Sequence, residues 1–154
     1  MTIHMLAALI GVIAGLRAVT APAAVSWAAW LGWLHLGGTP LAFFGFAATP
    51  WILTALAIGE LVADKLPSTP SRKLPVQFAT RVVTGAASGA AIGAAGQMLA
   101  AGLLLGALGA VIGTLGGAAA RARLAAAFGS DRPAALLEDA IAVGGAALIV
   151  FALR

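Results

Sequence analysis

Two long stretches without a charged side chain constrain this chain more than any other feature. Residues 18–59 and 82–120 contain no Asp, Glu, Lys or Arg. Each stretch holds about forty residues, which would make a straight helix of about 60 Å at about 1.5 Å per residue. The hydrocarbon core of a bilayer is only about 30 Å thick. Each stretch is therefore predicted to be a helical hairpin that crosses a membrane twice.

The composition favours a membrane protein over a soluble one. The chain is 62% hydrophobic and 9% charged, whereas soluble domains carry about 25% charged residues. A soluble fold of this size would have too little polar surface to cover its core. The net charge of +4 does not indicate nucleic acid, because the basic residues cluster at the ends of apolar runs, as the positive-inside rule describes. We expect membrane lipid, and no nucleic acid, as a partner.

The predicted fold is all-α: a polytopic transmembrane helical bundle with five full spans in a single domain. Residues 1–16 are expected to add a short membrane element, either a thin span, a re-entrant segment or an interfacial helix. The chain is expected in the cell inner (plasma) membrane. Its basic residues favour a cytoplasmic position for the proline-rich loop and for the connector at 121–132. The predicted segments are a first hairpin (18–63), a proline-rich basic loop (64–81), a glycine-rich hairpin (82–120), a basic connector (121–132) and a last span (133–153).

Within the first hairpin, one helix is expected from Thr20 to about Leu36 and a second from about Leu41 to Ala63. Thr20 is the expected N-cap of the first of these helices. Pro50 lies near the middle of the second, where proline frees a carbonyl and bends a helix.

Glycines recur at every fourth position in the second hairpin. This spacing places them on one face of a helix, where the missing side chains let another backbone approach closely. The pattern predicts glycine-zipper packing, with a partner from the same chain or from another subunit. The turn of this hairpin is expected near Gln97–Gly102. The glycines are Gly85, Gly89 and Gly93, and Gly109, Gly113 and Gly117.

A weak internal repeat suggests that the two hairpins are duplicates. Arg17-Ala-Val-Thr opens the first hairpin and Arg81-Val-Val-Thr opens the second. Duplicated helical units are common in transporters. In a duplicated arrangement, Arg17 and Arg81 would lie on the same side of the membrane.

The few charged residues are the candidates for chemistry. Glu60 and Asp64 share a helix face because they are four residues apart. Three interpretations stay open: a structural ion-pair cluster, a proton- or cation-coupled gate in which Glu60 and Glu138 titrate, and a divalent-ion site made of carboxylates, since hard oxygen ligands suit Mg²⁺ or Ca²⁺. The candidate residues are Arg17, Glu60, Asp64, Lys65, Arg72, Arg81, Glu138 and Asp139.

Signatures of catalysis are absent from the sequence. It contains no Walker loop, no G-x-S-x-G and no H-E-x-x-H motif. It also contains no Cys, which excludes thiolate chemistry and thiolate metal sites. We expect neither an enzyme nor a cofactor, and leave the question of a metal open.

Several segments together resemble a known family. They are G-L-R-A-x-x-A-P at Gly15–Pro22, G-E-L-V-A-D-K-L-P-S-T-P-S-R at Gly59–Arg72, the glycine repeats, and the late pair Glu138-Asp139. Over nearly the whole chain, this combination resembles an uncharacterised bacterial integral-membrane family labelled domain of unknown function 4126. The resemblance implies a small multi-span α-helical protein, and implies no activity, substrate or cofactor.

The sequence favours a transporter or channel for a small solute or ion, coupled to protons or cations through carboxylates paired with arginines. The expected path runs along the glycine-packed helices and is gated by Glu60, Asp64, Glu138 and Asp139 against Arg17 and Arg81. The alternative is a membrane scaffold that binds lipid or a partner protein through its basic loop. Because so small a chain encloses little volume, we expect a homo-oligomer, with a dimer favoured.

Overall fold

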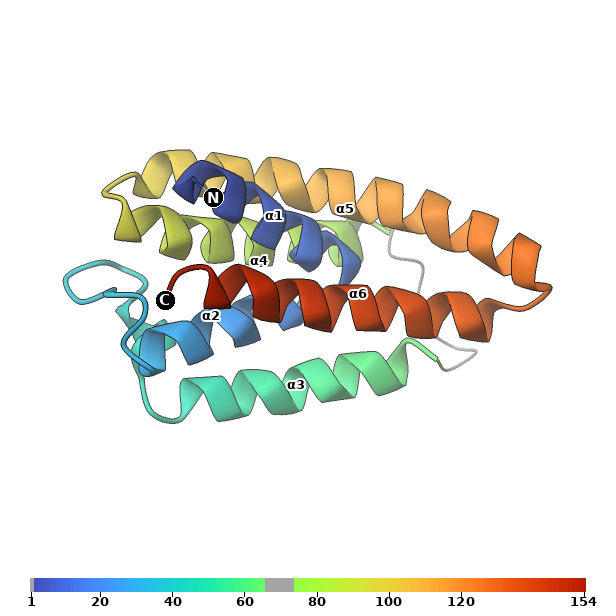
Figure 1. The fold of residues 1–154 in the computed structure, drawn as a ribbon, viewed down its shortest axis with the longest axis horizontal. Coiled ribbons are helices and arrows are strands. Elements are labelled where there is room, and N and C mark those ends of the chain that lie inside the picture. Colours follow the sequence, from blue (N-terminus) through green and yellow to red (C-terminus); the bar gives the residue numbers. More distant parts are fainter. Residues whose placement is uncertain (1, 66–73) are drawn as a thin grey trace.

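The computed structural model describes residues 2–65 and 74–154, which form six α-helices and one 3-10 helix and no β-strand. The helices run in alternating directions, so both ends of the chain lie at the same end of the bundle (Figure 1). α5 and α6 extend beyond the junction of α1 and α2. The elements are α1 (Ile3–Leu16), α2 (Thr20–Trp30), η1 (Ala42–Gly45), α3 (Thr49–Ala63), α4 (Pro75–Ala95), α5 (Leu99–Phe128) and α6 (Asp131–Phe151).

Helices α1, α4 and α5 pack backbone against backbone and form what we call the trunk. A methyl group added to Gly106 would lie 2.2 Å from the carbonyl oxygen of Gly85, and one added to Gly89 would lie 2.4 Å from that of Gly102. On the other side of α5, a methyl group on Gly113 would lie 2.2 Å from the carbonyl oxygen of Val12. The glycines therefore let three backbones approach closely, as expected where small residues line helix interfaces.

Five of the six zipper glycines lie at these contacts. Gly85, Gly89 and Gly93 face α5, while Gly109 and Gly113 face α1, so both partners come from the same chain. Gly117 is half-buried and borders a small cavity between α5 and α6. The helices of the trunk are too close for a solute to pass between their glycine faces. The solute path predicted along these glycine-packed helices is therefore absent.

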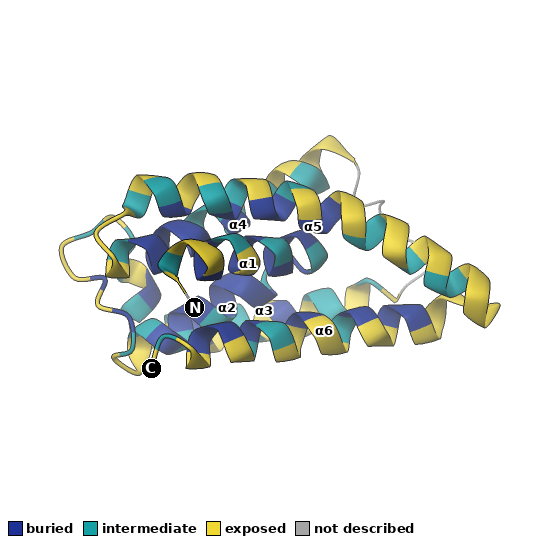
Figure 2. Cartoon of the chain, turned by 45° about the horizontal axis from the view of Figure 1, so that its top comes forward, coloured by how far each residue is buried: buried dark blue, intermediate teal, exposed yellow. Residues whose placement is uncertain are grey.

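Helices α2, α3 and α6 form a second layer, which we call the outer group. α2 contacts both α3 and α6, and it also contacts the trunk through α1 and α4. Trp27 joins α2 to α3, since its indole nitrogen donates to Thr54 Oγ1 at 2.9 Å and its ring meets Trp51 edge to face. Burial is concentrated where the two layers meet, and the outward faces of α3, α5 and α6 are exposed (Figure 2).

The prediction of five full spans is wrong. Among the described residues, two helices, α5 and α6, are long and apolar enough to cross a membrane by length and composition. The apolar helices α1 and α3 have only 14 and 15 residues, or about 21–23 Å. α4 has 21 residues, but Arg81, Gln77 and several Ser and Thr residues lower its hydropathy.

The absence of charge in residues 18–59 does not make them two long helices. Residues 18–59 instead contain the short helix α2, an irregular segment and most of α3. Gly32 and Gly38 adopt φ values of 80° and 79°, a left-handed conformation that glycine adopts without steric cost. Pro50 occupies the first turn of α3 and does not bend its middle. The N–H groups of a first turn have no acceptor within the helix, so the N–H that proline lacks is not needed there.

Other boundaries also differ from the prediction. Thr20 is the first residue of α2, and Val19 is its N-cap, without a capping side chain. α4 begins at Pro75, inside the expected loop, and the turn after it is residues 96–98. α5 continues to Phe128, so the connector expected at 121–132 is mostly helical.

The duplicated hairpin is not visible in the local structure. Arg17 has an extended backbone at the end of α1, whereas Arg81 lies inside helix α4. The sequence match between them therefore does not correspond to equivalent positions in two similar hairpins.

Candidate functional site

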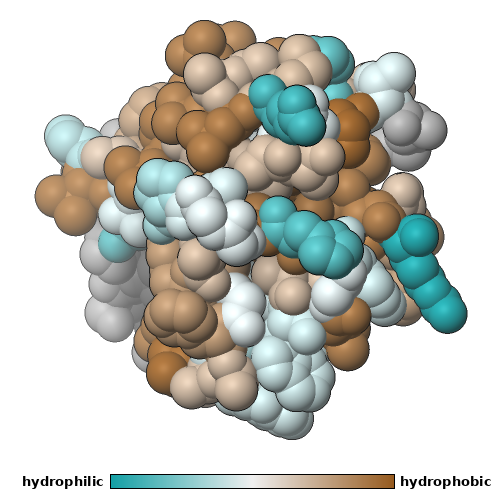
Figure 3. Space-filling view, turned by 90° about the vertical axis from the view of Figure 1, so that its left-hand side faces the viewer, coloured by the Kyte–Doolittle hydropathy of each residue, from teal (hydrophilic) through white to brown (hydrophobic). Residues whose placement is uncertain are grey.

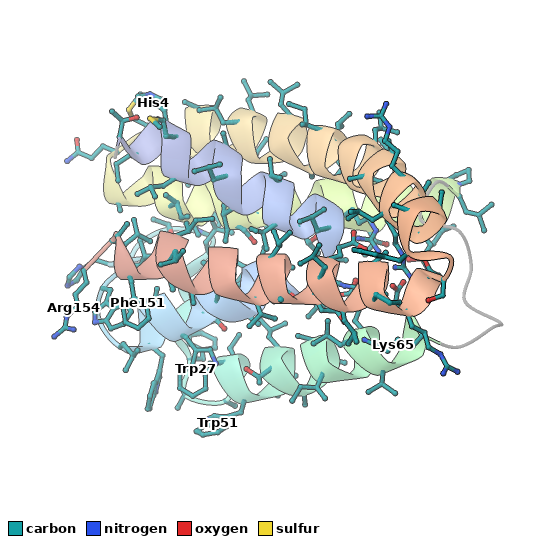
Figure 4. All side chains as sticks on the ribbon, turned by 45° about the vertical axis from the view of Figure 1, so that its right-hand side comes forward. His4, Trp27, Trp51, Lys65, Phe151 and Arg154 are labelled. Atoms are coloured by element: carbon teal, nitrogen blue, oxygen red, sulfur yellow. The ribbon has the colours of Figure 1, made fainter. Side chains whose placement is uncertain are left out.

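All five acidic side chains of the chain take part in ion pairs at one end of the bundle, which we call the ion-pair network. Lys65 marks this end in Figure 4, and Arg154 and His4 mark the opposite one. The members are Arg17, Lys65, Arg81 and Arg121, with Glu60, Asp64, Asp131, Glu138 and Asp139.

Arg17 lies at the centre of the network and is fully buried, with 0% of its side chain exposed. It follows the last residue of α1, where an extended backbone directs the chain into α2. Its Nη1 is 2.6 Å from Asp64, and its Nη2 contacts Asp139. Both Nη groups therefore face carboxylates, and opposite charge holds the buried side chain in place. Burial alone would lower the pKa of Arg17, but the neighbouring carboxylates outweigh it and raise the pKa.

Asp64 receives two arginines. Arg17 and Arg121 each approach its Oδ2 at 2.6 Å. Burial opposes ionisation of this carboxyl, but the contacts with Arg121 and Arg17 are stronger, so the pKa of Asp64 is lowered from its usual value. Asp64 is therefore a stable anion at neutral pH.

Arg121 is the second centre of the network. Its guanidinium contacts Asp64, Glu138 at 3.3 Å and Asp131 at 2.6 Å. With Asp131 the contact is bidentate, because Nε and Nη2 donate to the two carboxylate oxygens at 2.9 and 2.6 Å. Bidentate pairs of this kind fix the relative orientation of both groups.

Glu60 and Arg81 bind the backbone ends at the α1–α2 junction. The N–H groups of Ala18 and Val19 donate to the two oxygens of Glu60 at 2.7 and 2.9 Å. Arg81 Nη1 donates to the carbonyls of Gly15 and Leu16 at 2.9 and 2.7 Å. An acid at a helix N-terminus and a base at a C-terminus both complement the helix dipole. The two side chains also approach each other, at 3.6 Å.

The network joins the trunk to the outer group. Its three arginines belong to the trunk, at the end of α1, in α4 and in α5, while all five carboxylates belong to α3 and α6. Lys65 follows α3 and so adds a cation on the side of the acids, where it holds Asp139 at 2.5 Å. The interface between the two layers is thus charged at this end and apolar elsewhere.

Seven of the eight candidate residues meet in this network, and Arg72 lies outside the described residues. Arg121 and Asp131 are members that sequence reasoning missed. In the sequence, both residues are distinguished only because they follow the uncharged stretch 82–120. Arg123 and Arg132 follow the same stretch. No local spacing distinguished the paired arginine from its neighbours.

The acids do not form an evident metal site. In residues 2–65 and 74–154, no three acidic or histidine side chains converge as metal ligands. An arginine lies between the carboxylates of α3 and those of α6, where a divalent cation would have to sit. The geometry therefore does not support the divalent-ion interpretation.

No family model, curated protein or solved structure matches this chain. The resemblance to domain of unknown function 4126 thus stays a prediction, and function has to be argued from geometry.

Proposed function

We propose that the protein is a small transporter of the plasma membrane, in which the outer group moves against the trunk and the ion-pair network closes the path for a small solute or ion. The observation that carries this proposal is the division of the network, with arginines on one layer and acids on the other. The network is a closed contact between two bodies, and such contacts serve as gates in transporters that rock one helix group against another.

The outer surface supports a position within a membrane. Large apolar side chains are exposed all around the bundle, among them Leu148 at 73% and Leu104 at 63%. Seen from the end that holds both termini, the surface is also largely apolar with a few polar groups (Figure 3). Exposed apolar area on this scale marks contact with lipid or partners. We place α5 and α6 across the bilayer, and the network on its cytoplasmic side.

The α1–α2 junction supports movement at this interface. Transporters often use interrupted helices whose free backbone ends bind ions or polar groups inside the bundle. Here the free ends are held by Glu60 of the outer group and Arg81 of the trunk. Separation of the layers would release the N–H groups that Glu60 holds, while Arg81 would stay on the carbonyls of its own layer, and a polar passage would open beside Arg17.

Flux through proteoliposomes tests the proposal. The rates of proton, potassium, chloride, acetate, glycerol and alanine entry are compared between liposomes with and without protein. We expect one or more rates to rise, and Glu60→Gln and Arg17→Gln to reduce that rate by about tenfold or more. Arg17 contacts the acids Asp64 and Asp139 of the outer group, so its loss leaves the gate without its central cation.

Arg123→Gln provides the matched control, because Arg123 is an exposed arginine of α5 two residues from Arg121 and its loss changes the net charge equally. We expect its flux to equal that of the unmodified protein. Tryptophan emission and a single gel-filtration peak verify the fold of each variant. Entry rates equal to those of empty liposomes for every probe, or equal in Arg17→Gln and Arg123→Gln, would refute the proposal.

A further inference from the structure

The two sides of the ion-pair network respond differently when the layers separate. A carboxylate that loses its cation in a poorly hydrated place can take up a proton and become neutral. An arginine cannot become neutral, because its guanidinium stays protonated in proteins. The network has acids on the outer group and arginines on the trunk. Separation therefore favours proton uptake on one layer and anion binding on the other.

Arg17 is the arginine that separation leaves without an acid. Its side chain is 0% exposed, and the two acids that contact it, Asp64 and Asp139, belong to the outer group. A buried charge that loses its partners is strongly destabilising. Arg81 differs, because it keeps its two hydrogen bonds to carbonyl groups at the end of α1, in its own layer.

Arg121 also keeps a partner. Its bidentate contact is with Asp131, the first residue of α6, and only residues 129 and 130 separate α5 from α6 at this point. So short a connection keeps these two helix ends together when the rest of α6 moves. Among the three arginines of the network, Arg17 is therefore the one at which an anion is expected.

The guanidinium of Arg17 restricts the kind of anion. Asp64 contacts its Nη1 and Asp139 contacts its Nη2, so each acid occupies one arm of the planar group. A planar anion with two oxygens can bind both arms at once. Because Arg17 carries a single positive charge, one monovalent anion neutralises it. The side chain is fully enclosed, so the smallest opening that exposes it admits a small anion.

Asp64 is the acid expected to take up the proton. It faces Arg17 from the end of α1 and Arg121 from α5, and both arginines approach the same oxygen at 2.6 Å. Both belong to the trunk, so separation of the layers removes both contacts together. Protonation then removes the cost of leaving this carboxylate without a cation.

The other acids of the network lose less. Asp139 keeps Lys65, which follows α3 and belongs to the same layer. Asp131 is largely exposed to solvent, which stabilises its charge. Glu60 and Glu138 each approach one trunk arginine at a longer distance, 3.6 and 3.3 Å. Asp64 therefore gains most from protonation when the layers separate.

We propose that the protein carries a small monovalent oxyanion, of the carboxylate or nitrate type, which binds Arg17 and moves together with a proton on Asp64. This inference rests on the transport proposal and names its substrate class and its coupling. The closed state pairs Arg17 with Asp64, whereas the loaded state pairs Arg17 with the anion and leaves Asp64 neutral. Because anion and proton together carry no net charge, transport is electroneutral.

Nitrate entry into proteoliposomes tests the inference, because nitrate is planar and monovalent and stays ionised. Valinomycin with equal potassium on both sides holds the membrane potential at zero, pyranine reports the internal pH, and ion chromatography measures nitrate. An inward nitrate gradient should acidify the interior, with one proton for each nitrate ion. An inward gradient of gluconate, a bulkier anion, should not. This measurement uses the unmodified protein and does not depend on the fold of a variant.

Substitutions separate the two roles. Arg17→Gln should reduce nitrate entry by about tenfold or more, whereas Arg17→Lys, which keeps the positive charge, should retain part of it. In Asp64→Asn nitrate should still enter but without acidification, because the residue that carries the proton is gone. Asp64→Glu should keep both nitrate entry and acidification. Arg123→Gln is again the control with unchanged entry.

Each way of failing has its own signature. Entry of potassium, glycerol or alanine without entry of nitrate would leave the transport proposal standing and exclude an oxyanion as the substrate. Nitrate entry without acidification in the unmodified protein would exclude proton coupling. Equal acidification in Asp64→Asn and the unmodified protein would remove Asp64 as the proton carrier. If no probe enters faster than into empty liposomes, transport itself is refuted, and this inference with it.

Discussion

Asp64 is an acid on which two arginines from different helices converge. Its carboxylate is shared by arginines from the end of α1 and from α5, and 15% of its side chain remains exposed. Removal of one member of such a pair leaves the partner charges buried and uncompensated. The effect of Asp64 on stability should therefore be large and should depend on pH.

We predict that Asp64→Asn lowers the free energy of unfolding by about 3 kcal/mol at neutral pH, and that this difference shrinks in acid. The folded-state pKa of Asp64 is lowered relative to the unfolded chain. The stabilisation is then fully present above the unfolded pKa of about 3.9 and is lost as pH falls through the lower folded value. Thermal unfolding in nanodiscs from pH 7 to pH 2 measures it. A difference that stays constant across this range would contradict the prediction.

Sequence reasoning set most acids of the network against Arg17 and Arg81 but did not assign individual pairs, and it missed Arg121 and Asp131. The acids were few, and their positions at the ends of apolar runs singled them out. Pairing was unpredictable because the arginines lie on one set of helices and the acids on another, far apart in the sequence. The separation of Arg121 from Arg123 depends on how α5 is rotated against α6, which spacing along one helix does not determine.

At the scale of helices, the glycines of the trunk differ from other glycines of the same helix. Gly106 faces α4 and α1 across very short distances, whereas a methyl group on Gly116 would meet no atom within 4 Å. Both glycines are inside α5. The same substitution at the two positions therefore separates backbone packing from helix propensity.

We predict that Gly106→Ala destabilises the protein by about 1–3 kcal/mol or more, since the added methyl forces two backbones apart. Gly116→Ala should be neutral or stabilising by about 0.5–1 kcal/mol, because alanine favours the helix. Melting temperatures of both variants in one lipid composition check this. If the two variants melt at the same temperature, close packing of the trunk is not what requires glycine at position 106.

Helix ends were predicted less well than helix faces. The four-residue glycine spacing identified the packed faces of α4 and α5 because it depends only on helical periodicity. Pro50 was assigned to the middle of a helix, although a proline fits a helix start equally well. The choice depended on residues 31–48, whose turns follow from the positive φ of Gly32 and Gly38 and from packing that a single sequence does not display.

At the scale of the whole molecule, the distribution of charge is uneven. One end carries every acid, and the sides are covered with exposed apolar side chains. The uncharged stretches correctly indicated little polar surface but overestimated the number of long helices. Their total length predicted four membrane crossings. Hydropathy did not reveal that residues 31–48, between α2 and α3, form mainly turns and a short 3-10 helix. The expected homodimer stays a prediction.

We predict that the protein remains in the membrane pellet after alkaline carbonate extraction and requires detergent for release. Transfer of its exposed apolar side chains from lipid to water is unfavourable. Immunoblots of pellet and supernatant measure this, with a soluble protein and a known integral membrane protein as controls. Recovery in the carbonate supernatant would show that α5 and α6 are helices of a soluble or peripheral protein.

The packing of α1 against both α4 and α5 has a consequence for biosynthesis. α1 is translated before α5, yet the backbones that cover Gly11 and Gly15 belong to α5. The glycine face of α1 therefore stays uncovered until α5 has been made. Arg17 remains without one of its acids for longer still, since Asp139 lies in α6, which is translated after α5. Nascent chains halted before α6 should consequently be recognised by insertion factors and quality-control proteases as unfinished.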